Sequence, residues 1–187
     1  MTTPLDRDGI AELIPHSGPM CLLHRLVQWD LQQIVCLANN HRDPVHPLRS
    51  RSGLLASALI EYAAQAMALH GALIGRAAGL PVRPGYLASV RGTQLHVMTL
   101  HDLPQAGSAG PAAAAEPDEL RISATRQAGD ERQILYAFTA HHGSRLLAEG
   151  RAAVVLNTPV SLPHALRDAP PQEQPPTPPQ DLPRALP

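Results

Sequence analysis

One carboxylate lies in the middle of the longest apolar stretch of the chain, where a charged group needs either an interaction partner or a catalytic role. Glu61 falls within residues 54–78, which are rich in Ala, Leu, Ile and Met and contain no proline. Gln65 follows one helical turn later, on the same face of a helix. Burial of an unpaired carboxylate costs free energy. Glu61 is therefore either a structural residue, satisfied by Gln65, a backbone amide, a strand or a subunit seam, or a general acid or base.

The choice between these two roles depends on a second catalytic group. His46, in the loop before the apolar segment, is the candidate, because histidine exchanges protons near neutral pH. The chain has ten histidines, so one histidine ahead of Glu61 does not decide the question by itself.

Three motifs in order along the chain resemble one family. They are the run IPHSGPM at residues 14–20, the pair His46-Pro47, and the run IEYAAQAM at residues 60–67. Together they resemble the hotdog-fold 3-hydroxyacyl-(acyl carrier protein) dehydratases over residues 8–156. The resemblance is strongest to the branch found with aryl-polyene and xanthomonadin-type pigment gene clusters.

The resemblance implies a reaction and a catalytic pair. The reaction is dehydration of a 3-hydroxyacyl thioester to the trans-2-enoyl thioester, as in fatty-acid or polyketide synthesis. A histidine before the helix and an acidic residue within it carry over to His46 and Glu61, contributed by different subunits. No metal or other cofactor is implied, because the thioester already acidifies the proton that is removed, and the substrate arrives on the phosphopantetheine of an acyl carrier protein.

The resemblance also implies substrate-binding residues. Backbone amides at the helix start, around Ala56 and Ser57, are expected to polarise the thioester oxygen. Arg49 and Arg51, with Arg42, form either a solvated basic loop or a landing patch for the acidic carrier protein. His16 lies near the substrate tunnel in the resembling family, although from its Pro- and Gly-rich surroundings we interpret it as ordering a turn. Gln65 completes the predicted substrate-binding set.

The loop before the helix departs from the family pattern. The better-known dehydratases carry H-F-P-x-x-P-x-x-P-G, whereas here the aromatic and the later prolines are missing and Ala56 replaces the helix-opening glycine. The spacing from His46 to Glu61 is also one residue longer. Two alternatives therefore stay open: a non-catalytic partner subunit of an active dehydratase, and a hotdog thioesterase, which also uses a helix carboxylate.

The pattern of elements predicts an α+β fold. We expect a short helix at 8–14, a long helix at 54–78 that stops at Gly79, and an antiparallel sheet of about six strands wrapped around that helix. The strands are predicted at 21–29, 33–39, 86–100 with a bulge at Gly92, 119–126, 133–142 and 146–156. A helix this apolar is hard to cover with one sheet, which favours a homodimer or a heterodimer with a related subunit.

Composition and residue spacing limit the domain organisation, the ligand classes and the location that we expect for the chain. Residues 1–156 form the expected domain, and 157–187 form a tail, predicted to be disordered, that holds ten of the twenty prolines. The formal net charge of −1 argues against general nucleic-acid binding. Cys21 and Cys36 fall in predicted strands and are expected to be buried free thiols. The histidines show no metal-ligand spacing, and neither a signal peptide nor a transmembrane span is present, so we expect a cytoplasmic protein.

Overall fold

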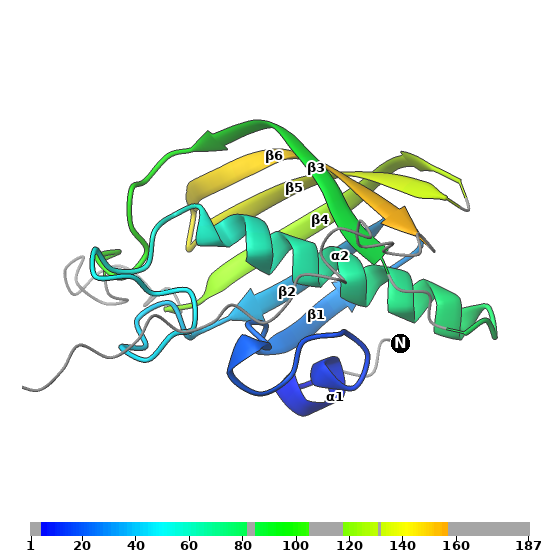
Figure 1. Ribbon diagram of the computed structural model, residues 1–187, viewed down its shortest axis with the longest axis horizontal. Coiled ribbons are helices and arrows are strands. Elements are labelled where there is room, and N and C mark those ends of the chain that lie inside the picture. Colours follow the sequence, from blue (N-terminus) through cyan, green and yellow to red (C-terminus); the bar gives the residue numbers. More distant parts are fainter. Residues whose placement is uncertain (1–4, 82–84, 105–117, 131, 157–187) are drawn as a thin grey trace, which may run out of the picture.

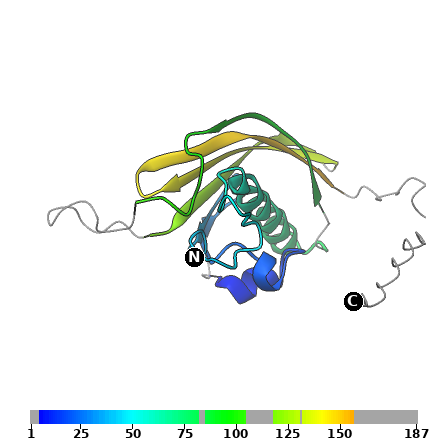
Figure 2. The same ribbon diagram turned by 60° about the vertical axis from the view of Figure 1, so that its left-hand side comes forward.

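A computed structural model of the chain describes residues 5–81, 85–104, 118–130 and 132–156. Six strands form one sheet in the order β1-β2-β4-β5-β6-β3, and every neighbouring pair is antiparallel. The sheet curves around one long helix, α2, as Figures 1 and 2 show. The predicted α+β architecture is confirmed. The bounds are β1 Arg25–Trp29, β2 Gln33–Ala38, β3 Gly85–Leu95, β4 Leu120–Gly129, β5 Gln133–His142 and β6 Arg145–Leu156.

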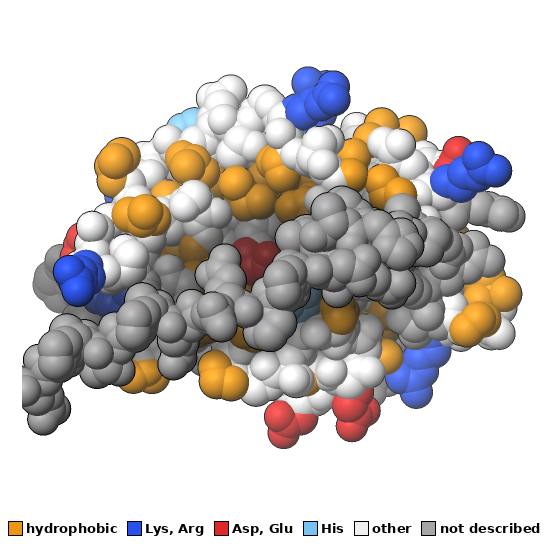
Figure 3. All heavy atoms as spheres, viewed as in Figure 1, with side chains coloured by type: hydrophobic (Ala, Val, Ile, Leu, Met, Phe, Trp, Pro, Cys, Tyr) orange, Lys and Arg blue, Asp and Glu red, His pale blue; other side chains and the backbone are white. Residues whose placement is uncertain are grey.

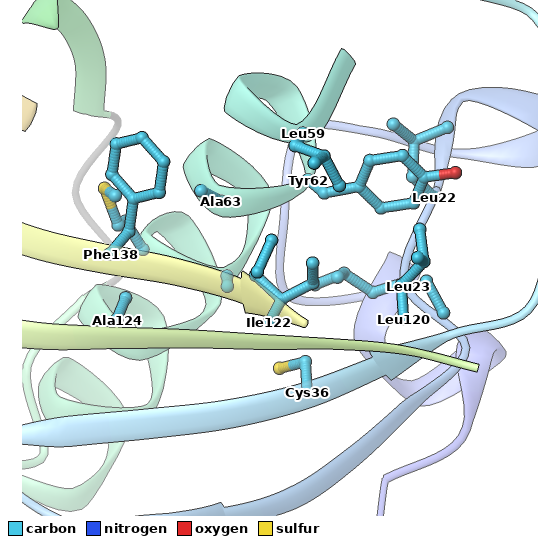
Figure 4. Packing of buried hydrophobic residues seen from close by; sticks show 14 of the residues in the cluster. Leu22, Leu23, Cys36, Leu59, Tyr62, Ala63, Leu120, Ile122, Ala124 and Phe138 are labelled. Atoms are coloured by element: carbon cyan, nitrogen blue, oxygen red, sulfur yellow. The ribbon is translucent and has the colours of Figure 1, made fainter. Parts of the chain in front are cut away.

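The helix α2, Ala58–Ala77, supplies one side of the core. It packs against β2, β4 and β5, and its side chains Leu59, Tyr62 and Ala63 meet strand residues such as Ile122 in the buried cluster of Figure 4. Each large apolar side chain that is fully buried contributes about 1.5–3 kcal/mol to folding. The helix is therefore held mainly by the apolar surface that the sheet covers.

The two ends of α2 test the predicted boundaries. Gly79 has φ +67°, a left-handed conformation that suits glycine, and so the predicted stop is confirmed. The predicted start at residue 54 is wrong. The Ala56 amide donates to the Met98 carbonyl at 2.9 Å, and the Leu54 carbonyl accepts from the Leu100 amide at 2.8 Å. These long-range backbone bonds hold 54–57 outside the helix.

Among the strands, the boundaries that differ most from the prediction are the start of β1 and the end of β3. β1 begins at Arg25, and so Cys21 lies before the strand, whereas Cys36 lies within β2 as expected; both are buried free thiols. Burial raises the pKa of Cys36 to about 12, which makes its thiol unreactive. β3 ends at Leu95. Its predicted bulge is confirmed, because Gly92 has φ +58° where the register with β6 shifts.

The segment before the sheet starts with a short helix, α1, Arg7–Ala11. Asp6 caps it by accepting from the Gly9 amide at 3.0 Å. The helix is shorter than the predicted 8–14, although the buried side chains of Ile10 and Ile14 still anchor this part of the chain.

A buried histidine, His70, ties α2 to the sheet. Its Nε2 lies 2.7 Å from the Asp30 carbonyl oxygen, and its Nδ1 lies 3.0 Å from the Tyr136 hydroxyl. A carbonyl can only accept, so Nε2 carries the proton and Tyr136 donates to Nδ1. The helix is thereby fixed both to the β1–β2 turn and to β5.

Two predictions fall on parts that the structure does not describe. The Pro-rich tail, 157–187, and most of the low-complexity stretch between β3 and β4, 105–117, lie outside the described residues. Within the described part, neither helix is long and apolar enough to cross a membrane.

Candidate active site around Glu61

The Glu61 carboxylate lies in the first turn of α2 and is partly open to solvent in the single chain. Its side chain is 32% exposed. One oxygen, Oε1, accepts a hydrogen bond from Gln65 Nε2 at 3.0 Å and lies 3.2 Å from His16 Nε2. Among the described residues no partner contacts the other oxygen, Oε2. The carboxylate is thus held from one side and free on the other.

Gln65 is the fixed point of this arrangement. Its side chain is fully buried, its Nε2 also donates to the Met20 carbonyl at 2.9 Å, and its Oε1 accepts from the Leu22 amide at 2.9 Å. These bonds attach the segment 20–22 to α2 and leave Gln65 little capacity for a ligand. Pairing with Gln65 was one of the alternatives that the sequence left open for Glu61, and the structure shows this hydrogen bond.

Two cavities meet at Glu61. The larger, of about 570 Å³, is lined by Glu61, His16 and mostly apolar residues from α2, β3, β5 and β6, among them Met67, Leu87 and Tyr136. The smaller, of about 400 Å³, is lined by Glu61, Ser57 and residues of the preceding loop. In Figure 3 hydrophobic side chains gather around a hollow beneath β3, and an acidic side chain shows inside it. A long apolar ligand can therefore reach the carboxylate.

The helix start offers one amide to this site. The Ala56 amide is already bonded to Met98, so the expectation that it is free is wrong. In the described part of the chain the Ser57 amide has no backbone partner, and Ser57 lines the smaller cavity together with Glu61. The predicted oxyanion donors are thus reduced to Ser57.

His46 lies in a hydrogen-bonded network of its own. Its side chain is buried, Nδ1 accepts from the Leu48 amide at 3.1 Å, and Nε2 lies 2.9 Å from the Tyr62 hydroxyl. The Tyr62 hydroxyl donates in turn to Asn40 Oδ1 at 2.6 Å. Because an amide can only donate, Nε2 carries the ring proton and donates to Tyr62. Burial lowers the pKa of His46, which keeps the ring neutral.

Within one chain, the structure pairs Glu61 with His16 and not with His46. His46 faces a third cavity, of about 520 Å³, that Glu61 does not line. His16 shares both a contact and a cavity with Glu61, which its Pro- and Gly-rich neighbours gave no reason to expect. Its Nδ1 is buried without a hydrogen-bond partner in the described residues. The sequence signal that could have found it is the run IPHSGPM, whose Met20 carbonyl bonds to Gln65.

The loop arginines separate into two kinds. Arg42 donates to both oxygens of Asp118, at 2.8 and 3.0 Å, and to the carbonyls of His101 and Leu103. It is therefore committed to internal contacts. Arg51 is exposed, and Arg49 has a buried Nη1 without a hydrogen-bond partner among the described residues. Arg49 and Arg51 remain the cations available to an external anion.

Solved structures share this fold. A chain of the dehydratase heterocomplex ApeI:P from Xenorhabdus doucetiae matches with a TM-score of 0.67 at 19% identity, covering 90% of this chain and 100% of that one. A thioesterase family protein from Silicibacter pomeroyi matches with a TM-score of 0.51 at 14% identity, covering 80% and 93%. At these identities the matches establish the hotdog fold and nothing finer. A comparison with curated protein sequences finds no match.

A comparison with protein-family profiles identifies the family as well as the fold. The profile of the ApeP-like family, described as ApeP dehydratase, matches residues 9–162, which include the end of α1, all of α2 and all six strands. The match spans more than half of the chain and includes the segments that carry His16, His46 and Glu61. This chain belongs to the ApeP-like dehydratase family.

Proposed function

We propose that the chain takes part in the dehydration of 3-hydroxyacyl thioesters carried on an acyl carrier protein, with Glu61 as the catalytic carboxylate. A base removes a proton from the carbon next to the thioester carbonyl, and Glu61 donates a proton to the leaving hydroxyl on the next carbon. A carbon–carbon double bond forms, water departs, and the thioester is retained. Products of this kind serve fatty-acid-like or polyene synthesis.

The observation that carries the proposal is the placement of Glu61 where two cavities meet, with one oxygen held and the other free. The larger cavity has the apolar lining that an acyl chain needs, and the smaller one, next to the Ser57 amide, has room for the thioester. An amide at the start of a 20-residue helix stabilises negative charge that develops on a carbonyl oxygen. Acid, amide and apolar channel therefore meet at one point.

The base is a histidine, and two are candidates. The family resemblance points to His46 of a second subunit, and its burial in a separate cavity agrees with a site that one chain does not complete. The contact with Glu61 points to His16 of the same chain. We propose His46 as the base and His16 as the residue that positions Glu61. To act as the base, His46 needs an unprotonated ring nitrogen facing the substrate. Its proton therefore has to move from Nε2 to Nδ1, and its hydrogen bonds with Tyr62 and with the Leu48 amide have to open during turnover.

Partner binding follows from the exposed edge of the sheet. β3 is an edge strand of eleven residues, and Tyr86, Leu87 and Leu95 on it are 46%, 39% and 44% exposed. A long apolar edge strand invites pairing with another strand. We propose that β3 meets a second hotdog subunit, as a homodimer or, by analogy with the ApeI:P heterocomplex, as a heterodimer, and that Arg49 and Arg51 contact the carrier protein.

The test is an assay that separates dehydration from hydrolysis. A 3-hydroxyacyl thioester of a carrier protein is incubated with the chain alone and with its co-purified partner, and enoyl thioester and free thiol are both measured. The proposal expects enoyl thioester without free thiol. Release of free thiol without enoyl product would instead identify a thioesterase.

A second candidate function is a subunit that binds but does not turn over substrate. The observation in its favour is that both ring nitrogens of His46 are already used in hydrogen bonds. Variants His46→Gln and Glu61→Gln, assembled with an unchanged partner, decide between the two. If neither variant slows the complex, the chain has a supporting role only.

A further inference from the structure

Three titratable side chains from distant parts of the chain meet away from Glu61. His41 follows the end of β2, Asp118 precedes β4, and His142 ends β5. His142 Nε2 lies 2.9 Å and His41 Nε2 3.4 Å from the same oxygen, Asp118 Oδ1. One ligand atom from each residue lies within 4.8 Å of the other two. None of the three lines either cavity at Glu61.

His41 is the unusual member of this cluster. Its side chain is 1% exposed, and in the described part of the chain neither ring nitrogen has a hydrogen-bond partner. The approach of Nε2 to Asp118 is within reach of an ion pair but lacks the direction of a hydrogen bond. Buried polar atoms are nearly always satisfied by protein, water or an ion, so this ring indicates a missing partner.

We propose that His41, His142 and Asp118 bind one divalent transition-metal ion of the zinc class. Ligand atoms around a tetrahedral zinc ion lie about 2.0–2.2 Å from the metal and therefore about 3.4 Å from each other. Two of the three observed separations, 2.9 and 3.4 Å, are close to this geometry, and the third, between His41 and His142, is within 4.8 Å. Two imidazoles and one carboxylate suit zinc, cobalt or nickel, whereas magnesium and calcium prefer oxygen ligands alone.

The hydrogen bonding of His142 has to rearrange for this role. His142 Nε2 donates to Asp118 Oδ1, because an ionised carboxylate can only accept, and metal binding requires the ring proton to reside on Nδ1 instead. The single hydrogen bond between His142 and Asp118 is then exchanged for two metal bonds.

Arg42 opposes metal binding at this cluster. Its guanidinium donates to both oxygens of Asp118 and holds the pKa of that carboxyl well below its usual range. The same positive charge repels a metal cation, which sets the affinity below that of an unopposed site. It also orients the carboxylate, as outer-shell partners of metal ligands commonly do. The site would tie three strand ends together where the loop that carries His46 begins.

The experiment uses tag-free, chelator-treated protein titrated with Zn²⁺ in a calorimeter, with Mg²⁺ as a negative control and Co²⁺ absorption as a spectroscopic probe of nitrogen ligation. Wild type is expected to bind one Zn²⁺, with a Co²⁺ visible spectrum, and to melt at a higher temperature with Zn²⁺. His142→Ala and Asp118→Asn are each expected to weaken Zn²⁺ binding at least tenfold, judged by the losses that even outer-shell substitutions cause.

Two matched controls exclude other sites. His141→Ala removes the neighbouring histidine of the same strand, and Glu61→Gln removes the carboxylate beside His16; both are expected to bind Zn²⁺ as wild type does. The proposal is overturned if wild type binds no stoichiometric Zn²⁺, or if folded His142→Ala and Asp118→Asn bind it unchanged. The wild-type Co²⁺ spectrum decides the matter even if a variant does not fold. None of these readouts depends on dehydration.

Discussion

At the scale of single residues, the two oxygens of Glu61 have different surroundings. Oε1 contacts Gln65 and His16, while Oε2 has no hydrogen-bond or ion-pair partner among the described residues. Gln65 is itself fixed by backbone groups at residues 20 and 22. Gln65 and His16 therefore hold the carboxylate in one orientation and leave Oε2 for a substrate. Neither of these two side chains needs to contact that substrate.

The contact between His16 and Glu61 predicts a graded effect on turnover. His16→Ala removes the contact to Oε1 and is expected to lower kcat of the complex about tenfold, equivalent to ~1.4 kcal/mol in the barrier. His16→Gln is expected to retain most of the rate, because its amide nitrogen can donate to the same oxygen. KM should change little in both variants.

Steady-state kinetics on both variants check this prediction. Equal losses in His16→Ala and His16→Gln, or a change confined to KM, would show that His16 does not orient the carboxylate. A rate lost entirely in both would instead indicate that His16 is itself the base.

The network around His46 predicts a stability effect. Tyr62→Phe removes a buried hydroxyl that accepts from His46 and donates to Asn40. The two groups left without a partner are expected to cost about 1–3 kcal/mol in the free energy of unfolding. Urea denaturation measures this cost, with Tyr86→Phe, at a 46% exposed residue, as the matched control expected to change stability by less than about 0.5 kcal/mol. Equal stability of the two variants would contradict the network.

At the scale of elements, the contacts that position α2 can be predicted only in part from the sequence of the helix itself. Its apolar run and the glycine after it predicted a long helix and its end, because saturation with Ala, Leu and Ile leaves few alternatives. Its start was missed, since the Ala56 amide and the Leu54 carbonyl bond to backbone groups of Met98 and Leu100, more than forty residues away. The strands could be predicted from runs of residues with strand-like patterns. Their ends could not, because they also depend on bonds to distant parts of the chain.

The candidate site shows the same division between local and distant information. Glu61 with Gln65 one turn later is a local relation and was predictable. His16 meets Glu61, and His41 meets Asp118 and His142, only because the chain folds back on itself over 45, 77 and 101 residues (61 − 16, 118 − 41 and 142 − 41). Sequence motifs based on residue spacing do not predict contacts at such separations.

The buried histidines predict a loss of stability in mild acid. Burial lowers the pKa of His41, to about 4, and also the pKa values of His46 and His70. Below about pH 6.5 the unfolded chain binds protons at these residues while the folded chain does not, so the free energy of unfolding falls as pH falls from 6.5 toward 4. His41 alone contributes about 3 kcal/mol across this window.

Urea denaturation at pH 7, 6 and 5 checks this prediction, and the unfolding free energy should decrease at each step. Asp118 acts in a lower window, because its pKa is depressed by Arg42 and its contribution is lost only as pH falls below the usual range of a carboxyl. A free energy that is constant between pH 7 and pH 5 would mean that these rings can take up protons in the folded chain.

At the scale of the whole molecule, the sheet has two edges of different character. β1 is a short edge of five residues, and β3 is a long edge of eleven residues with exposed apolar side chains. The larger cavity at Glu61 opens between α2 and this second edge, with Tyr86 and Leu87 in its wall. A second subunit on β3 would therefore also close the cavity.

The asymmetry of the edges predicts which substitution breaks the assembly. Leu95→Lys on β3 is expected to shift the chain, or its complex with a co-purified partner, toward monomer, because a lysine on an edge strand opposes pairing. Val27→Lys on β1, at a residue 37% exposed against 44% for Leu95, is the matched control and should leave the assembly unchanged. Analytical ultracentrifugation measures both. Dissociation by Val27→Lys alone would place the interface at the other edge.

The most direct measurement of the central claim is the rate at which the assembled protein with Glu61→Gln forms enoyl thioester from a 3-hydroxyacyl thioester of a carrier protein. Loss of a positioned acid costs about 10²–10⁴-fold in rate, so the variant is expected to be at least ~100-fold slower than wild type while its melting temperature stays close to that of wild type. A Glu61→Gln complex that dehydrates at the wild-type rate would contradict the assignment of this carboxylate as the catalytic group.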